Sequence, residues 1–152
     1  MKGRNFAITL TIILSVGIFA VAGYLHAAEN DAAYQAMVDG AKQMMDGNKK
    51  VMDIMAKKGI KDAELTAAEK EMKEGYDMIM KGQGMVATNK AQAQEMASKG
   101  GKMMLDAQKK TEAVVEKKGM TQECKIDLSE CTYGEQKIKQ GALQWFFGAP
   151  GL

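Results

Sequence analysis

Methionine is the residue type in this chain with the greatest capacity for chemistry. The sequence contains 14 methionines but few leucines. A thioether is a soft donor that selects Cu(I) over hard cations, whereas the same flexible side chain also fills irregular hydrophobic cores. Leucine would serve a core at least as well and cannot be oxidised. The sequence therefore leaves two interpretations open, a soft-metal ligand and a core filler.

Steps of three, four or seven residues place methionines on one side of a helix, as in Met52 and Met55. Met103 and Met104 could also face Met44 and Met45 if their helices pack together. The ions that such a site would take are Cu(I) or Ag(I). The candidate ligands are Met37, Met44, Met45, Met52, Met55, Met78, Met80, Met103 and Met104.

Other chemistries have little support. The single histidine, His26, lies beside the N-terminal apolar segment, so imidazole metal sites and nucleophile–base pairs cannot be assembled beyond it. No C-x-x-C-H haem motif occurs. Residues 1–22 contain two basic residues and no acidic ones. The rest of the chain contains 19 basic and 19 acidic residues, so its formal charge is close to zero. Such a neutral chain has no electrostatic footprint for nucleic acid. We expect neither an enzyme nor a nucleic-acid-binding protein.

The two cysteines, Cys124 and Cys131, are seven residues apart. On one continuous helix their Cα atoms would be about 10.5 Å apart, beyond the ~7 Å limit for a disulfide. A bridge therefore requires a turn between them, which a new helix N-cap at Asp127 or Ser129 would allow. We expect a disulfide-linked helix–turn–helix, with free thiols or a thiolate metal pair as the alternative.

An internal repeat organises the chain. Residues 37–47 (MVDGAKQMMDG) match residues 72–82 (MKEGYDMIMKG), and residues 48–59 (NKKVMDIMAKKG) match residues 108–119 (QKKTEAVVEKKG). In each copy the apolar residues recur at steps of three and four, with charged residues on the other side. The pattern predicts amphipathic helices over 30–58, 66–81 and 86–118, and a shorter helical region within 121–147.

Glycine and threonine predict the helix ends. Gly59 and Gly119 each follow Lys-Lys and are typical C-terminal caps. Thr66 and Glu69 resemble a capping box. Glycines inside the helices recur at seven-residue steps, which indicates close helix approach, or else a helix that opens around a ligand. The expected fold is all-α: an antiparallel bundle of three long helices plus a short disulfide-linked C-terminal helical segment.

The N-terminus predicts export. Lys2 and Arg4 precede an apolar run from Phe6 to Ala22, which ends in Ala-Val-Ala. This pattern is typical of a secretory signal peptide spanning 1–22, with a second cleavage position at 27. An uncleaved membrane anchor is the alternative, since the stretch from Phe6 to Leu25 is about long enough to cross a bilayer. A periplasmic or secreted protein is expected, with a repeat bundle over 30–119 and a C-terminal segment over 120–152.

The aromatic tail, Trp145, Phe146 and Phe147, is conspicuous in a chain with few aromatic residues. It can plug one end of the bundle, or it can contact a membrane surface or a partner protein.

With its signal peptide and heptad-like repeats of one ligand type over residues 30–119, the chain resembles small exported bacterial metal-binding helical-bundle proteins. Methionine stands where those proteins use histidine, which shifts the implied metal from divalent ions to Cu(I) or Ag(I). The expected function is soft-metal binding or buffering. The alternative is a structural or chaperone-like bundle whose methionines adapt to apolar partners.

Overall fold

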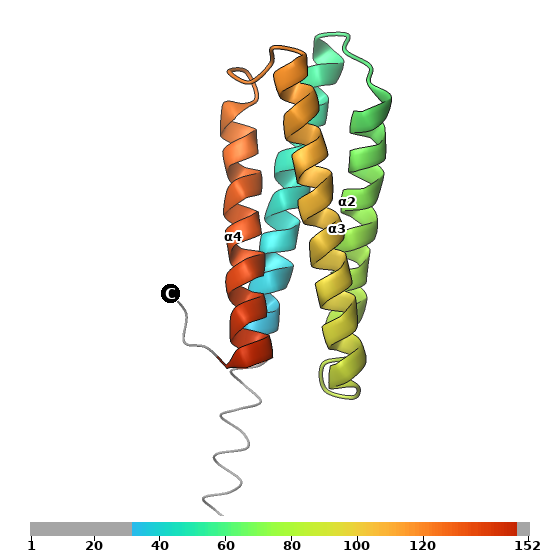
Figure 1. The fold of residues 1–152 in the computed structure, drawn as a ribbon, viewed down its shortest axis with the longest axis vertical. Coiled ribbons are helices and arrows are strands. Elements are labelled where there is room, and N and C mark those ends of the chain that lie inside the picture. Colours follow the sequence, from blue (N-terminus) through green and yellow to red (C-terminus); the bar gives the residue numbers. More distant parts are fainter. Residues whose placement is uncertain (1–31, 149–152) are drawn as a thin grey trace, which may run out of the picture. The chain divides into compact units, whose positions relative to one another are not determined.

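The computed structural model describes residues 32–148, which form four helices and no strands (Figure 1). The first helix is described over residues 32–57. It is followed by α2 (Ala63–Gln83), α3 (Lys90–Lys117) and α4 (Lys125–Phe147). Short connections make successive helices antiparallel, so the predicted all-α bundle is confirmed. The predicted signal peptide, 1–22 or 1–27, lies outside the described residues.

The fourth helix corrects the prediction of a short C-terminal segment. With 23 residues, α4 is longer than the 21-residue α2. The expected turn between the cysteines is absent, because neither Asp127 nor Ser129 starts a new helix and α4 continues through both. Ser129 and Thr132 lie inside α4. Their hydroxyl groups instead donate to the carbonyl oxygens of Ile126 and Leu128 within α4, at 2.6 and 3.1 Å. Hydroxyl groups satisfied in this way leave the helix uninterrupted.

The predicted glycine caps are confirmed. Gly59 and Gly119 have φ angles of 70° and 68°, in the left-handed region where glycine carries no Cβ penalty. The residue after each glycine makes the same hydrogen bond. The Ile60 amide donates to the Met55 carbonyl, and the Met120 amide donates to the Val115 carbonyl, both at 2.9 Å. The two repeat copies thus end in the same Schellman-type turn.

The predicted capping box is wrong. Asp62 is the N-cap of α2, and its carboxylate accepts the Glu64 amide at 2.9 Å. Thr66 lies inside the first turn and donates to the Asp62 carbonyl. An aspartate is the stronger N-cap, and this one also pairs with Lys118 across the turn at 3.1 Å, so the helix begins three residues earlier than expected.

Glycines bring the helices together in two close pairs. A Cβ on Gly40 in the first helix would lie 2.6 Å from the Gly134 carbonyl oxygen of α4. In the other pair, a Cβ on Gly75 of α2 would lie 2.6 Å from the Gly100 oxygen of α3. Real Cβ atoms do not approach so closely, so only glycine permits these backbone contacts. Of the two roles considered for the glycines, close helix approach is confirmed.

The hydrophobic interior has two parts. The large core runs along most of the bundle, and the small core lies near the turns at Gly59 and Gly119. Between them Asn48 and Thr111 are buried and joined by a 2.9 Å hydrogen bond, with buried Gln108 one turn away on α3. The large core contains Ala33, Tyr34, Met37, Val38, Ala41, Met44, Ala68, Met72, Ile79, Ala93, Ala97, Met104, Ala107, Ile138 and Trp145. The small core contains Val51, Met55, Leu65, Val114, Val115, Met120 and Cys124.

Candidate soft-metal site

The nine methionines predicted as ligands do not meet at one point. Three of them are buried in the large core, Met55 is buried in the small core, and Met80 is exposed. The remaining four, Met45, Met52, Met78 and Met103, are half-buried. The three in the large core are Met37, Met44 and Met104.

Each of these three methionines covers a glycine at a close contact between helices. The Met44 Cγ lies 2.6 Å from where a Gly134 Cβ would stand, and the Met104 Cγ lies 2.7 Å from that position at Gly75. Met37 lies over Gly141 in the same manner, at 2.7 Å. An unbranched side chain fits over a bare backbone, which explains why methionine occurs here. For these three residues, packing accounts for the residue type.

The small core is rich in sulfur-containing side chains. Met55, Met120 and Cys124 are buried in it, and Met52 packs against it from the side. Met52 and Met55 also line a pocket of about 400 Å³ beside Leu65 and Ile60, which connects this sulfur group to the surface. We call Met52, Met55, Met120 and Cys124 the sulfur cluster. Its donor set, three thioethers and one thiol, is one that a soft ion prefers.

Sequence reasoning missed two members of this cluster. Met120 was not among the candidate ligands, and Cys124 was assigned to a disulfide. The available signal was their four-residue spacing, which puts both side chains on one side of a helical turn. The Cys124 amide donates to the Met120 carbonyl at 3.0 Å, so this turn is present.

The disulfide prediction is wrong, since Cys124 and Cys131 are both free and buried. Cys124 is the residue before α4, and Cys131 lies two turns along that helix, so their side chains are too far apart to bridge. Burial raises the pKa of both thiols, that of Cys131 to about 12. The Cys131 thiol donates to the Met44 carbonyl at 3.6 Å. Both groups are therefore protonated at neutral pH unless a metal displaces the proton.

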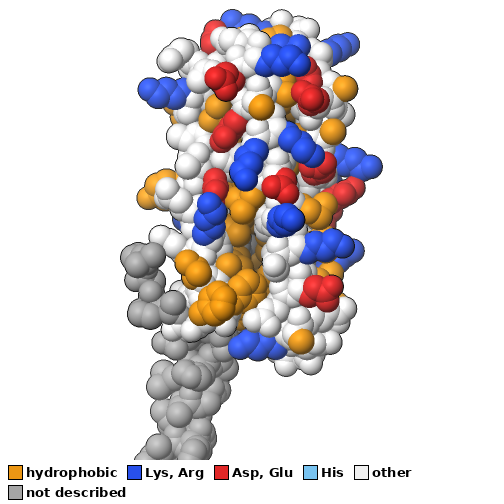
Figure 2. Space-filling model, in the orientation of Figure 1, with side chains coloured by type: hydrophobic (Ala, Val, Ile, Leu, Met, Phe, Trp, Pro, Cys, Tyr) orange, Lys and Arg blue, Asp and Glu red, His pale blue; other side chains and the backbone are white. Residues whose placement is uncertain are grey.

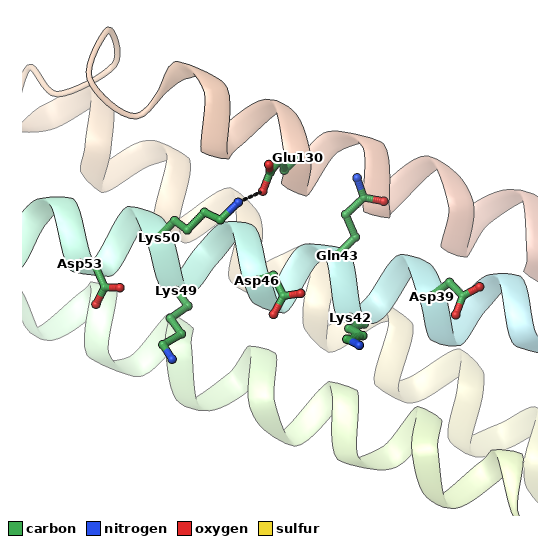
Figure 3. A pocket seen from close by; sticks show the side chains of 8 residues that line it. All are labelled: Asp39, Lys42, Gln43, Asp46, Lys49, Lys50, Asp53 and Glu130. Carbon is green, nitrogen blue, oxygen red and sulfur yellow. Dashed lines mark hydrogen bonds and ion pairs between the residues drawn. The ribbon is translucent and has the colours of Figure 1, made fainter.

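Carboxylates do not supply a second kind of metal site. Among residues 32–148, no three His, Cys, Asp or Glu side chains are grouped so as to hold an ion. A hollow of about 610 Å³ between the first helix and α4 is lined by charges of both signs (Figure 3). Its carboxylates alternate with lysines, and Lys50 is paired with Glu130 at 2.7 Å. Alternating charges of this kind are typical of a solvated helix face.

The aromatic tail is divided between the interior and the surface. Trp145 is buried, with its ring edge-on to Tyr34 at a centroid distance of 4.9 Å. Phe147, two residues later, is 76% exposed. Of the two roles predicted for the tail, Trp145 has the plugging role, whereas Phe147 projects from the bundle.

A hydrophobic groove follows the wide seam between α3 and α4. It has a volume of about 410 Å³, and Leu105, Ile138 and Phe146 are among its lining residues. Figure 2 shows this strip of hydrophobic side chains, with charged residues along its upper part. At this seam a Cβ on Gly101 of α3 would meet the Ile138 side chain of α4 at 3.4 Å, an ordinary contact distance, so Gly101 makes no close backbone contact with α4. An apolar groove flanked by charges can receive an apolar segment of another molecule.

Comparisons with protein-family models, with curated proteins and with solved structures gave no match. Within the described part of the chain, no helix has the length and apolar character needed to cross a membrane. The function is therefore argued from the geometry of the chain itself.

Proposed function

We propose that this is an exported, non-enzymatic helical bundle that binds a soft metal ion, Cu(I) or Ag(I), through its methionines. The observation that carries the proposal is the sulfur cluster, in which Met55, Met120 and Cys124 share one small core and Met52 packs against it. Soft ions prefer thioether and thiolate donors to oxygen and to protonated amines. The pocket that leads to Met52 and Met55 also has Lys61 and Asp62 in its lining, and a soft ion prefers the sulfur donors to both.

Access and electrostatics support this location. Met52 and Met55 line the 400 Å³ pocket, so an ion reaches these two thioethers without unfolding of the bundle. Once bound, it would displace the Cys124 proton, because a coordinated thiol is deprotonated. The resulting thiolate would neutralise the single positive charge within an apolar environment, which reduces the penalty of burying either charge. Metal binding is thus expected to release about one proton.

The test is anaerobic titration of the exported protein with Cu(I) against a chromophoric competitor. We expect tight Cu(I) binding, no measurable Zn(II) binding, and at least a tenfold loss of Cu(I) affinity in Met52→Leu/Met55→Leu and in Cys124→Ala. Methionine to leucine conserves volume and costs little stability, so helicity should persist.

The matched control is Met44→Leu/Met104→Leu, which removes two buried thioethers from the large core. This control is expected to bind Cu(I) as the native protein does. If the control loses affinity and the sulfur-cluster variants keep it, the proposed location is wrong. If the native protein does not compete for Cu(I) at all, the function is wrong.

The groove between α3 and α4 favours a second candidate function, a structural or chaperone-like role towards apolar protein segments. Its wall combines Met37 and Leu105 with Phe146, and a flexible thioether adapts to varied partners. Under this role, Leu105→Ser would weaken the binding of an unfolded client in an aggregation assay, whereas the sulfur-cluster variants would retain it.

A further inference from the structure

The two ends of the bundle differ in charge. The end with the turns at Gly59 and Gly119 has lysines and acids together, among them Lys61, Asp62 and Glu123. The opposite end is formed by the start of the first helix, the α2–α3 connection and the end of α4. Described residues 32–38, 78–94 and 136–148 contain no aspartate or glutamate, and their charged residues are Lys81, Lys90, Lys137 and Lys139. Lys139 is paired with Glu135, the first acid that precedes this part of α4.

This opposite end also has the exposed aromatic surface, and we call it the aromatic end. Phe147 is 76% exposed and Leu143, one turn earlier on α4, is 46% exposed. Phe146 is half-buried beside Trp145, with ring centroids 5.3 Å apart. Lys90 lies over the Trp145 ring at 5.8 Å from its centroid. Aromatic rings next to lysines, without carboxylates, are the composition found where proteins meet a membrane–water interface.

An apolar segment precedes, along the chain, the helix that starts at the aromatic end. The run from Phe6 to Leu25 contains no charged residue, and helix 32–57 begins a few residues later. The Ala33 carbonyl oxygen would lie 2.6 Å from a Cβ on Gly141, so the first helix starts beside the last two turns of α4. Along the chain, the N-terminal apolar run therefore directly precedes the helix that starts at the end of the bundle with Phe147. Glu29 and Asp31, within this connection, are outside the described residues.

We propose that the aromatic end docks on the surface of a lipid bilayer that contains anionic lipids. Phe147 and Leu143 insert at the level of the headgroups, while Lys81 and Lys90 approach the lipid phosphates. Each buried apolar side chain adds to the partition energy, and each lysine near an anionic surface adds an electrostatic contribution. With the bundle axis directed away from the membrane, the charged end and the sulfur cluster face the aqueous compartment.

α4 offers a matched probe at each end. Ile126 is 74% exposed near its first residue and Phe147 is 76% exposed at its last, so substitution at either perturbs little packing. Full-length Phe147→Trp and Ile126→Trp variants are combined with vesicles of phosphatidylcholine and phosphatidylglycerol that contain brominated lipid. We expect bromine to quench the tryptophan added at 147 and to leave the one added at 126 unchanged, each measured as the difference from the parent protein, which contains Trp145. This difference is expected whether or not the N-terminal segment is retained.

Affinity is measured by flotation of the exported, processed protein with the same vesicles without bromine. Phe147→Ser is expected to weaken binding about tenfold or more, and Ile126→Ser is expected to have no effect. Equal quenching at both positions, or no quenching at 147, would overturn the proposal. It also fails if sedimentation without vesicles reveals a dimer that Phe147→Ser dissociates, because a second copy would then cover this surface.

Discussion

At the scale of single residues, the thiol of Cys131 is the most strongly perturbed group in the interior. It is 1% exposed, and burial raises its pKa to about 12, with Glu112 and Glu130 acting in the same direction. The native state therefore holds this proton more tightly than the unfolded state does. The corresponding stabilisation is fully present below the unfolded thiol pKa of about 8.5 and is lost as pH rises towards 12.

We accordingly expect the thermal unfolding midpoint to fall between pH 8 and pH 10.5, and to fall less steeply in Cys131→Ala. Tyr34, whose pKa burial raises to about 12, contributes equally to both proteins. Loss of the thiol volume lowers the midpoint of the variant at every pH, so the comparison is between slopes. Parallel pH profiles from circular dichroism would contradict the assignment.

At the scale of helices, the glycine contacts predict opposite effects for one substitution at two positions. Gly40→Ala would push a methyl group against the Gly134 carbonyl oxygen and the Lys137 Cβ, at 2.6 and 2.8 Å. Gly101→Ala would meet only the Ile138 methyl group at 3.4 Å. We expect the first to lower the free energy of unfolding by about 1–3 kcal/mol through overpacking. The second should raise it by up to about 1 kcal/mol, because alanine is the better helix former.

Urea unfolding followed by circular dichroism measures both effects, with Gly101→Ala serving as the control for propensity. Equal shifts in the two variants would mean that the close helix pairs are looser than described.

Helix formation could be predicted from the sequence more readily than helix pairing. The stripe from Met37 to Met55 and the caps at Gly59 and Gly119 are local signals, and they were sufficient. The length of α4 was missed because Ser129 and Asp127 were interpreted as a new N-cap. The glycines of the first helix and of α2 follow the same seven-residue step, so the pattern could not reveal that α4 pairs with one and α3 with the other.

The candidate site was predictable only in part. Met52 and Met55 were recognised from their spacing on one helix. Met120 and Cys124 join them through contacts between the turn after α3 and the first helix, and such long-range contacts leave no periodic signal. Conversely, Met37, Met44 and Met104 have the helical spacing expected of ligands. In the structure, however, they pack over glycines of neighbouring helices.

At the scale of the whole molecule, a polar layer separates the large core from the small core. The Thr111 hydroxyl donates to the Asn48 carboxamide oxygen at 2.9 Å, and both residues are almost fully buried. Asn48 and Gln108 occupy equivalent positions in the internal repeat, so each copy has a side-chain amide at this point. A buried polar pair specifies the register between the first helix and α3, since sliding either helix would leave both groups unpaired.

Thr111→Val keeps the side-chain shape and removes the donor. We expect it to lower the free energy of unfolding by about 1–3 kcal/mol, because the Asn48 oxygen is then buried without a partner. Thr132→Val is the control, since its exposed hydroxyl donates only within α4 and its loss should cost less than about 0.5 kcal/mol. Urea unfolding measures the free energy of unfolding of both variants. Equal losses in the two would mean that the buried polar layer does not contribute to stability.

The close pair formed by the first helix and α4 also joins distant parts of the chain. The backbone contact between Gly40 and Gly134 closes a loop that contains α2, α3 and all three connections. Closing so long a loop carries an entropic cost that the local α2–α3 hairpin does not have. The α2–α3 hairpin is therefore expected to form first. The first helix and α4 then pack against it and against each other. Cys124 and Cys131 cannot form a disulfide. The contact between Gly40 and Gly134 therefore holds together two distant segments of the chain, as a disulfide would.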